Sequence, residues 1–194
     1  MHIRFGRDYY QRYYFDPHTA VASRSEIRAR ARLIAACSAH LQLPVRRILD
    51  AGCGTGLLRG TLRRLLPRAH YVALESSEYL CRRYGWVRGR VEDYRPRAPF
   101  DLVICYDVLQ YLDAAAAQRA LENFGRLCRG VLYFTALTRR DYEQNCDRER
   151  TDAAVHLRSA RWYRVRLVRQ FREVGLGFWL RRGAPLTLWE LESS

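Results

Sequence analysis

Residues 48–56 have the sequence ILDAGCGTG, an apolar run that ends at Asp50 and continues into three alternating glycines, Gly52, Gly54 and Gly56. Glycines at this spacing allow a tight turn, and they let a ligand lie directly on the backbone because no Cβ stands between them. A helix that begins after the turn presents free N–H groups to a polar or anionic group. A nicotinamide dinucleotide fingerprint would need a third glycine where Leu57 stands, so the sequence does not fit a pyrophosphate-binding loop of that kind.

Strands and helices alternate on both sides of this turn. We expect strands at 45–50, 70–75, 86–91, 100–106 and 130–137, and helices at 57–66, 78–84, 114–128 and 158–174. Two last strands, 176–181 and 185–191, are expected to form an antiparallel hairpin around Gly183. This order predicts right-handed βαβ units and a parallel sheet with both faces covered, within a single domain over residues 1–194.

The segment before the first strand, residues 1–42, is predicted to be a helical lid or cap on a core of residues 43–194. Ser23 and Glu26 form a capping box, and the helix that follows places Ile27, Ala31, Ile34 and Leu41 on one face. Ahead of it, the pairs Tyr9/Tyr13 and Tyr10/Tyr14 would form two adjacent aromatic rows on a helix. These tyrosines either close over a ligand and contact the substrate, or pack as an ordinary amphipathic helix.

Acidic residues follow the next strands at informative positions. Glu75 ends the second strand, 25 residues after Asp50, and the pair Glu92 and Asp93 follows the weak third strand. The fourth strand, 100–106, is apolar on both faces, as a central parallel strand must be, and Asp107 comes directly after it.

The pattern D-x-G-x-G-x-G, from Asp50 to Gly56, resembles the first motif of class I S-adenosylmethionine-dependent methyltransferases, and the resemblance extends from about Val45 to the C-terminus. It implies a three-layer, Rossmann-like α/β fold whose seven-stranded sheet is mostly parallel, with one antiparallel strand near the C-terminal edge. It also implies S-adenosylmethionine as the cofactor and S-adenosylhomocysteine as the product.

The resemblance assigns roles to particular residues. Glu75 would accept hydrogen bonds from the two ribose hydroxyls, and Glu92 or Asp93, with Asp93 preferred, would accept from the adenine amino group. The full set of expected cofactor-binding residues follows the strand ends and consists of Asp50, Gly52, Cys53, Gly54, Gly56, Glu75, Ser76, Glu92, Asp93 and Tyr106.

The methyl acceptor is expected at the end of the fourth strand. Asp107 is the candidate base, or the group that orients an amine, unless it caps the following helix; Tyr111 is the second candidate catalytic residue. Gln110 and His156 are candidate substrate contacts, and His156 lies in a segment of mixed charge, 138–156, that could equally be a solvated surface.

The net charge of +14 raises the question of a nucleic-acid partner. All 34 basic residues are arginine, with no lysine, and they occur in every part of the sequence, which is typical of a GC-rich, bacterial-like composition rather than of one polyanion-binding stripe. The six scattered cysteines have no metal-ligand spacing, so no metal is expected. No apolar run is long enough for a membrane helix and no secretory signal is evident, so a cytoplasmic location is expected.

These observations predict an S-adenosylmethionine-dependent methyltransferase that acts on a small molecule. RNA- or protein-directed methylation remains the alternative, although the (D/N/S)-P-P-(Y/F) motif and a Pro-Cys nucleophile of nucleic-acid enzymes are absent from the sequence. A cofactor-binding partner subunit without catalysis is a third possibility. The oligomeric state stays open.

Overall fold

The structure, a computed structural model of the 194-residue chain, describes residues 5–16 and 18–190. Its centre is a seven-stranded sheet with the strand order β3-β2-β1-β4-β5-β7-β6. The strands are β1 (Arg47–Ala51), β2 (His70–Glu75), β3 (Val87–Arg88), β4 (Phe100–Tyr106), β5 (Cys128–Thr135), β6 (Phe171–Gly175) and β7 (Phe178–Arg181). Strands β1 to β5 pair in parallel, whereas β7 runs antiparallel to both of its neighbours. The predicted fold class, with one antiparallel strand near the C-terminal edge, is confirmed.

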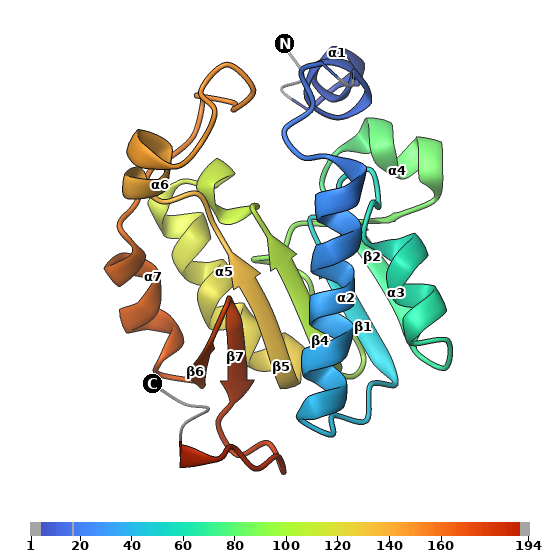
Figure 1. The fold of residues 1–194 in the computed structure, drawn as a ribbon, viewed down its shortest axis with the longest axis vertical. Coiled ribbons are helices and arrows are strands. Elements are labelled where there is room, and N and C mark those ends of the chain that lie inside the picture. Colours follow the sequence, from blue (N-terminus) through green and yellow to red (C-terminus); the bar gives the residue numbers. More distant parts are fainter. Residues whose placement is uncertain (1–4, 17, 191–194) are drawn as a thin grey trace.

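Helices cover both faces of the sheet (Figure 1). On one face, α2 (Arg24–His40) and α3 (Arg59–Leu65) pack against the apolar side chains of β1, β4 and β5. On the other face, α5 (Ala114–Leu127) and α7 (Ala160–Leu167) enclose a second apolar cluster. A shorter helix, α4 (Glu78–Tyr84), lies beside β2 and β3 and ends at Gly85, which has a φ of 70°.

Helix α2 begins as the sequence predicts. The Ser23 hydroxyl accepts from the Glu26 N–H, and the Glu26 carboxylate accepts from the Ser23 N–H, so both halves of the capping box are present. The predicted apolar face, Ile27, Ala31, Ile34 and Leu41, is buried. This second part of the predicted cap therefore lies against the sheet.

The C-terminal elements differ from the expectation. The helix predicted at 158–174 is shorter in the structure and ends at Leu167. It buries Tyr163 and Leu167, whereas Phe171 already begins strand β6. The hairpin joins β6 to β7 through Leu176 and Gly177, whose φ angles are both positive, 51° and 87°. Two consecutive residues with positive φ form the tight turn that suits a two-residue hairpin. The predicted hairpin around Gly183 and the strand 185–191 are wrong over the described residues, and Leu191 itself lies outside them.

Two segments from distant parts of the sequence lie beyond the carboxyl ends of the parallel strands (Figure 1). The first is the N-terminal pair of short helices, α1 (Arg7–Tyr10) and the π-helical η1 (Gln11–Phe15). The second connects β5 to α7 and contains α6 (Arg139–Gln144). In the described part of the chain, no helix combines the length and the apolarity needed to span a membrane.

Candidate active site at the carboxyl ends of the strands

The loop after β1 has the backbone conformation that its three glycines allow. Gly52, Gly54 and Gly56 all have positive φ angles, between 53° and 75°. A Cβ on Gly56 would lie 2.7 Å from the Trp86 ring, so the loop has no room for a side chain there. At Gly54, by contrast, the atom nearest to an added Cβ would be 3.8 Å away, on Tyr14. Gly54 therefore leaves its backbone uncovered apart from this contact with Tyr14, and it lines two of the cavities described below.

Glu75 joins the end of β2 to this loop. One carboxylate oxygen accepts from the Gly54 N–H at 2.8 Å, and the other accepts from the N–H groups of Ser76 and Ser77 at 2.8 and 2.9 Å. Charge-assisted bonds of this kind hold a carboxylate in one orientation. The side chain is buried and lines a cavity of about 110 Å³ together with Gly52, Gly54 and Ser76. The sequence-predicted group Gly54, Glu75 and Ser76 is thus brought together.

Asp50, at the end of β1, is buried beneath the loop. Burial raises the pKa of its carboxyl to about 7; the hydroxyl of Tyr71, which donates to it, lowers that pKa, and nearby Glu75 raises it. Asp50, Gly52, Cys53 and Gly54 line a cavity of about 230 Å³. Burial also raises the pKa of the Cys53 thiol.

The two acidic residues after β3, Glu92 and Asp93, lie in different environments. Glu92 is 1% exposed; one of its carboxylate oxygens pairs with Arg90 at 2.5 Å, and the other is buried without a hydrogen-bond partner. It lines a third cavity, of about 430 Å³, with Ser76, Val91 and Val108. Asp93, which the sequence favoured, is exposed and does not line this cavity.

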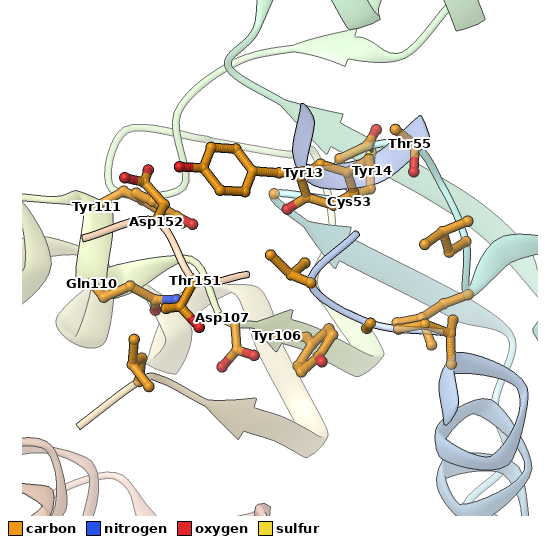
Figure 2. A pocket seen from close by; sticks show the side chains of 18 of the residues that line it. Tyr13, Tyr14, Cys53, Thr55, Tyr106, Asp107, Gln110, Tyr111, Thr151 and Asp152 are labelled. Carbon is orange, nitrogen blue, oxygen red and sulfur yellow. Dashed lines mark hydrogen bonds between the residues drawn. The ribbon is translucent and has the colours of Figure 1, made fainter. Parts of the chain in front are cut away.

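The three cavities share walls formed by Gly52 and Tyr111, so they lie along one side of the glycine loop. Figure 2 shows the 230 Å³ cavity, with Cys53 and Thr55 of the loop, the N-terminal Tyr13 and Tyr14, and a group of polar side chains from the end of β4 and from the 138–156 segment. That polar group consists of Asp107, Gln110, Tyr111, Thr151 and Asp152.

The aromatic N-terminal segment closes over this site. The ring centroids of Tyr9 and Tyr13 are 4.9 Å apart and those of Tyr10 and Tyr14 are 5.3 Å apart, so both predicted rows form. The Tyr9 hydroxyl donates to the Tyr111 hydroxyl at 3.1 Å, and the Ser77 hydroxyl donates to the carbonyl of Phe5 at 2.7 Å. We refer to residues 5–15 as the aromatic lid, since they contact both the β2 side and the β4 side of the site.

Asp107 sits in a strained position at the end of β4. Its φ of 54° is uncommon for a residue other than glycine, although aspartate tolerates it better than most. Its carboxylate accepts from the Thr135 hydroxyl at 3.1 Å. Burial raises the pKa of this carboxyl, while the bonds from Thr135 and Tyr106 and the charge of Arg30 oppose the increase. A buried, oriented carboxylate beside the cavity can accept a proton or an N–H bond.

Gln110 and Tyr111 lie on the short helix η2 (Leu109–Tyr111), which Arg158 holds in place. The Arg158 guanidinium donates to the carbonyls of Leu109 and Leu112 at 3.0 and 2.6 Å. Gln110 is 3% exposed, and its side-chain oxygen has no hydrogen-bond partner. The His156 N–H donates to the Gln110 carbonyl at 2.7 Å, but the His156 side chain is exposed and does not line the cavity. His156 therefore supports η2 through its backbone.

Sequence reasoning missed several residues of the site. Thr55, Thr151 and Asp152 line the 230 Å³ cavity. Arg30 of α2 places its guanidinium 4.2 Å from the ring centroid of Tyr106, beside an opening of about 410 Å³ that it shares with Asp107. Burial raises the pKa of Tyr106 to about 12. Arg30 could not be found from a motif, because only the packing of α2 on the sheet brings it to the end of β4.

No metal-binding cluster of three or more His, Cys, Asp or Glu side chains occurs in residues 5–16 and 18–190. The 230 Å³ cavity is lined by backbone, carboxylates, hydroxyls, one amide, thiols, aromatic rings and aliphatic side chains. This set can bind a polar organic ligand and exclude water from it.

Part of the chain matches a known protein family. Residues 49–130 match the family model described as a methyltransferase domain. No curated protein matches the sequence.

Solved structures share the fold at low sequence identity. The N-methyltransferase NodS from Bradyrhizobium japonicum WM9, in complex with S-adenosylhomocysteine, is 16% identical, with 79% of this chain and 86% of that chain covered and a TM-score of 0.56. Magnesium protoporphyrin IX methyltransferase from Synechocystis PCC 6803, with bound S-adenosylmethionine, is 17% identical, with 81% and 79% covered and a TM-score of 0.59. The amino pentose methyltransferase CalS10 from Micromonospora echinaspora is 19% identical, with 80% and 91% covered and a TM-score of 0.57.

At these identities the likeness to solved structures shows a common fold. The family match adds that residues 49–130 resemble a methyltransferase domain. The glycine loop lies within the matched residues, at the carboxyl edge of the predicted seven-stranded, mostly parallel sheet. Residues 49–130 of the chain therefore match a methyltransferase domain, and the whole sheet has the Rossmann-like fold of the methyltransferase structures named above.

Proposed function

We propose that the protein transfers a methyl group from S-adenosylmethionine to a small-molecule acceptor that is enclosed between the end of β4 and the aromatic lid. The observation that carries this proposal is the 230 Å³ cavity. Its walls come from the glycine loop, from Asp107 and Gln110, and from Tyr13 and Tyr14 of the lid. A covered cavity of this size suits a small acceptor better than a nucleic-acid strand or a protein surface.

The residues present fit the cofactor. Glu92 has a buried carboxylate oxygen without a partner, which would accept from the adenine amino group. Glu75 is held in one orientation at the 110 Å³ cavity, where it would accept from the ribose hydroxyls. Gly54 offers bare backbone to the methionine half, beside Asp50 and Cys53. Leaving the Glu92 oxygen unpaired would cost about 1–3 kcal/mol, so a donor there contributes directly to affinity.

Methyl transfer requires the protein mainly to position the acceptor against the cofactor. The cofactor supplies an activated methyl group on a sulfonium, so the protein must align the acceptor and exclude water; orientation of this kind can supply roughly 7–11 kcal/mol in the best cases. In this chain the lid excludes water, and Asp107, held by Thr135, accepts a proton or orients the acceptor. Tyr111, bonded to Tyr9, closes the same wall.

The solved structures named above also support a small acceptor. They are those of an N-methyltransferase, a porphyrin methyltransferase and an amino pentose methyltransferase. The arginines give no contrary signal at the cavity itself, because none of those in the described part of the chain lines it.

The direct test of the proposal is S-adenosylhomocysteine release with a panel of small acceptors and with total RNA, at a salt concentration of about 150 mM. We expect release with at least one small acceptor and none with RNA, whose binding should weaken with salt with a slope of about −0.7 per phosphate neutralised. Methylation of RNA, or of a protein substrate alone, would replace the proposal with one of those alternatives. Binding of the cofactor without release on any substrate would favour a non-catalytic subunit.

Two neighbouring carboxylates give a matched test of the cofactor geometry. Glu92→Gln should weaken S-adenosylhomocysteine binding by about tenfold, which corresponds to about 1.4 kcal/mol, since an amide oxygen is a weaker acceptor than a carboxylate. Asp93→Asn, one residue further on and exposed, should leave the affinity unchanged. The opposite result in calorimetry would return the adenine contact to Asp93.

A further inference from the structure

The acceptor end of the 230 Å³ cavity has a marked charge character. The charged side chains among the described residues that line the cavity are all carboxylates: Asp107 and Asp152 at the acceptor end, and Asp50 beneath the glycine loop. None of the described arginines lines it, in a chain that has 34. An anionic acceptor would be repelled by these groups, whereas a cation would be stabilised by them.

Gln110 adds a hydrogen-bond acceptor to this wall. Its side-chain oxygen is buried and has no donor from the protein, and η2 is fixed from two sides, by Arg158 on the flanking carbonyls and by the His156 N–H on the Gln110 carbonyl. A buried acceptor that has no donor, on a residue that lines a cavity, is costly unless a ligand in that cavity donates to it.

Aromatic rings complete the enclosure. Tyr13, Tyr14, Tyr106 and Tyr111 line the same cavity, and Figure 2 shows them with Asp107 and Gln110 around it. Burial raises the pKa of Tyr14, so its phenol stays neutral. Aromatic rings that line a cavity can stabilise a cation held among them. One face of Tyr106 is already covered by Arg30, which leaves this ring a smaller role.

We propose that the methyl acceptor is the nitrogen of a small cationic amine, whose N–H groups donate to Asp107 and to the side-chain oxygen of Gln110 within a tyrosine-lined, carboxylate-rich cavity. This inference rests on the proposed function and assigns its substrate class. Gln110 is then a specificity-determining residue, because a carboxylate has no hydrogen to donate to it, and an alcohol has a single O–H, which cannot donate to both Gln110 and Asp107.

The step balances with groups already named. The ammonium form of the acceptor gives one proton to the Asp107 carboxylate. The freed nitrogen lone pair forms an N–C bond to the methyl group while the C–S bond of the donor breaks and its electron pair stays on sulfur. The products are the methylated ammonium and neutral S-adenosylhomocysteine, and Asp107 later returns its proton to water. Thr135, Tyr106, Arg30 and Asp141 are the groups that act on the Asp107 carboxyl during this exchange.

The test compares amines, alcohols and carboxylic acids that have identical carbon skeletons. S-adenosylhomocysteine release should occur with amines and not with their alcohol or acid counterparts. In the presence of S-adenosylhomocysteine, the same amines should raise the melting temperature of the protein.

Two variants of Gln110 separate its role from a structural one. Gln110→Met keeps the shape and removes the acceptor, so the KM for the amine should rise about tenfold with little change in kcat. Gln110→Glu restores an acceptor of the same shape, so it should recover a low KM. Neither variant should change S-adenosylhomocysteine affinity.

The outcomes distinguish a failure of the proposed function from a failure of the amine assignment. Failure of the wild-type protein to bind S-adenosylhomocysteine would contradict the proposed function itself. If the protein binds the cofactor, three results would overturn the amine assignment and leave the cofactor site standing. They are methylation of alcohols or acids, an equal KM for the amine in Gln110→Met and wild type, and no amine that is bound or methylated.

Discussion

The cofactor side and the acceptor side of the cavity are built in different ways. The cofactor side is local: the loop after β1 is bonded to the end of β2, through Gly52 N–H to the Leu74 carbonyl and Gly54 N–H to Glu75. The acceptor side collects single side chains from distant segments, Tyr13 from the lid, Gln110 from η2 and Asp152 from the connection before α7. The first can be shared by a whole family of enzymes, while the second can change its specificity without disturbing the sheet.

Removing the aromatic lid should have the largest effect on turnover. A protein that lacks residues 1–15 keeps the sheet and α2, so we expect it to fold. Without Tyr13, Tyr14 and the Tyr9–Tyr111 bond, water enters and the acceptor loses one wall, so turnover should fall by on the order of 100-fold. Circular dichroism checks the fold and S-adenosylhomocysteine release checks the rate. Full activity of the truncated protein would show that the tyrosines serve only packing.

Glu75→Ala should damage the cofactor side while leaving the acceptor wall in place. The change removes the group that accepts from Gly54, Ser76 and Ser77 and that faces the ribose, so S-adenosylhomocysteine binding should weaken by about 1–3 kcal/mol. Glu78→Ala is the control: Glu78 pairs with Arg82 and Arg88 at the surface of α4, and its loss should leave affinity unchanged. Equal affinities of both variants in calorimetry would contradict the assignment of Glu75.

Asp50→Asn should have the smallest effect, on the pH dependence of stability. The pKa of Asp50 is raised from 3.8 to about 7 in the folded protein, chiefly by burial. Such a group contributes its full stability below the unfolded pKa, and this contribution is lost as the pH rises through the folded pKa. The free energy of unfolding of the wild type should therefore decrease between about pH 4 and pH 7, by at most about 1.4 kcal/mol per pH unit from this residue.

The matched experiment is urea unfolding at about pH 5 and about pH 7. Asp50→Asn keeps an oxygen for the Tyr71 hydroxyl but has no proton to lose, so its decrease over this range should be smaller than that of the wild type. Asp93→Asn, at an exposed site, should behave as the wild type. If the free energy of unfolding decreased equally between these two pH values in all three proteins, Asp50 would not be the cause of the pH dependence.

The same contrast explains what could be predicted from the sequence. The glycine loop, Glu75, the capping box at Ser23 and the tyrosine rows depend on neighbours within a few residues or on one strand pair, so local rules were sufficient. Arg30 and Asp152 depend on how distant segments pack, and no local pattern marks them.

The C-terminal error has a related cause. The spacing of Trp162, Val165, Val168 and Phe171 fits a helix, yet Val165 and Val168 are exposed and Phe171 belongs to β6. Tertiary contacts with β7 decided between helix and strand there, and these contacts override local periodicity. The choice between Glu92 and Asp93 was likewise open, because adjacent residues differ in burial only once the loop after β3 is placed.

The proposed position of the cofactor depends most directly on the absence of a side chain at Gly54, which a matched pair of variants can test. Gly54→Ala and Gly85→Ala both place a methyl group at a positive φ, 53° and 70°, and neither meets a protein atom closer than 3.8 Å. Both should therefore lose a similar, small amount of stability, on the order of 1 kcal/mol. Only the methyl group at Gly54 would project into the cavity.

The decisive measurement is calorimetric titration of the wild type and of these two variants with S-adenosylhomocysteine. We predict one binding site in the wild type, unchanged affinity in Gly85→Ala, and a loss of binding of at least about 100-fold, or about 2.7 kcal/mol, in Gly54→Ala. Equal affinity in all three proteins would contradict the placement of the cofactor on the glycine loop.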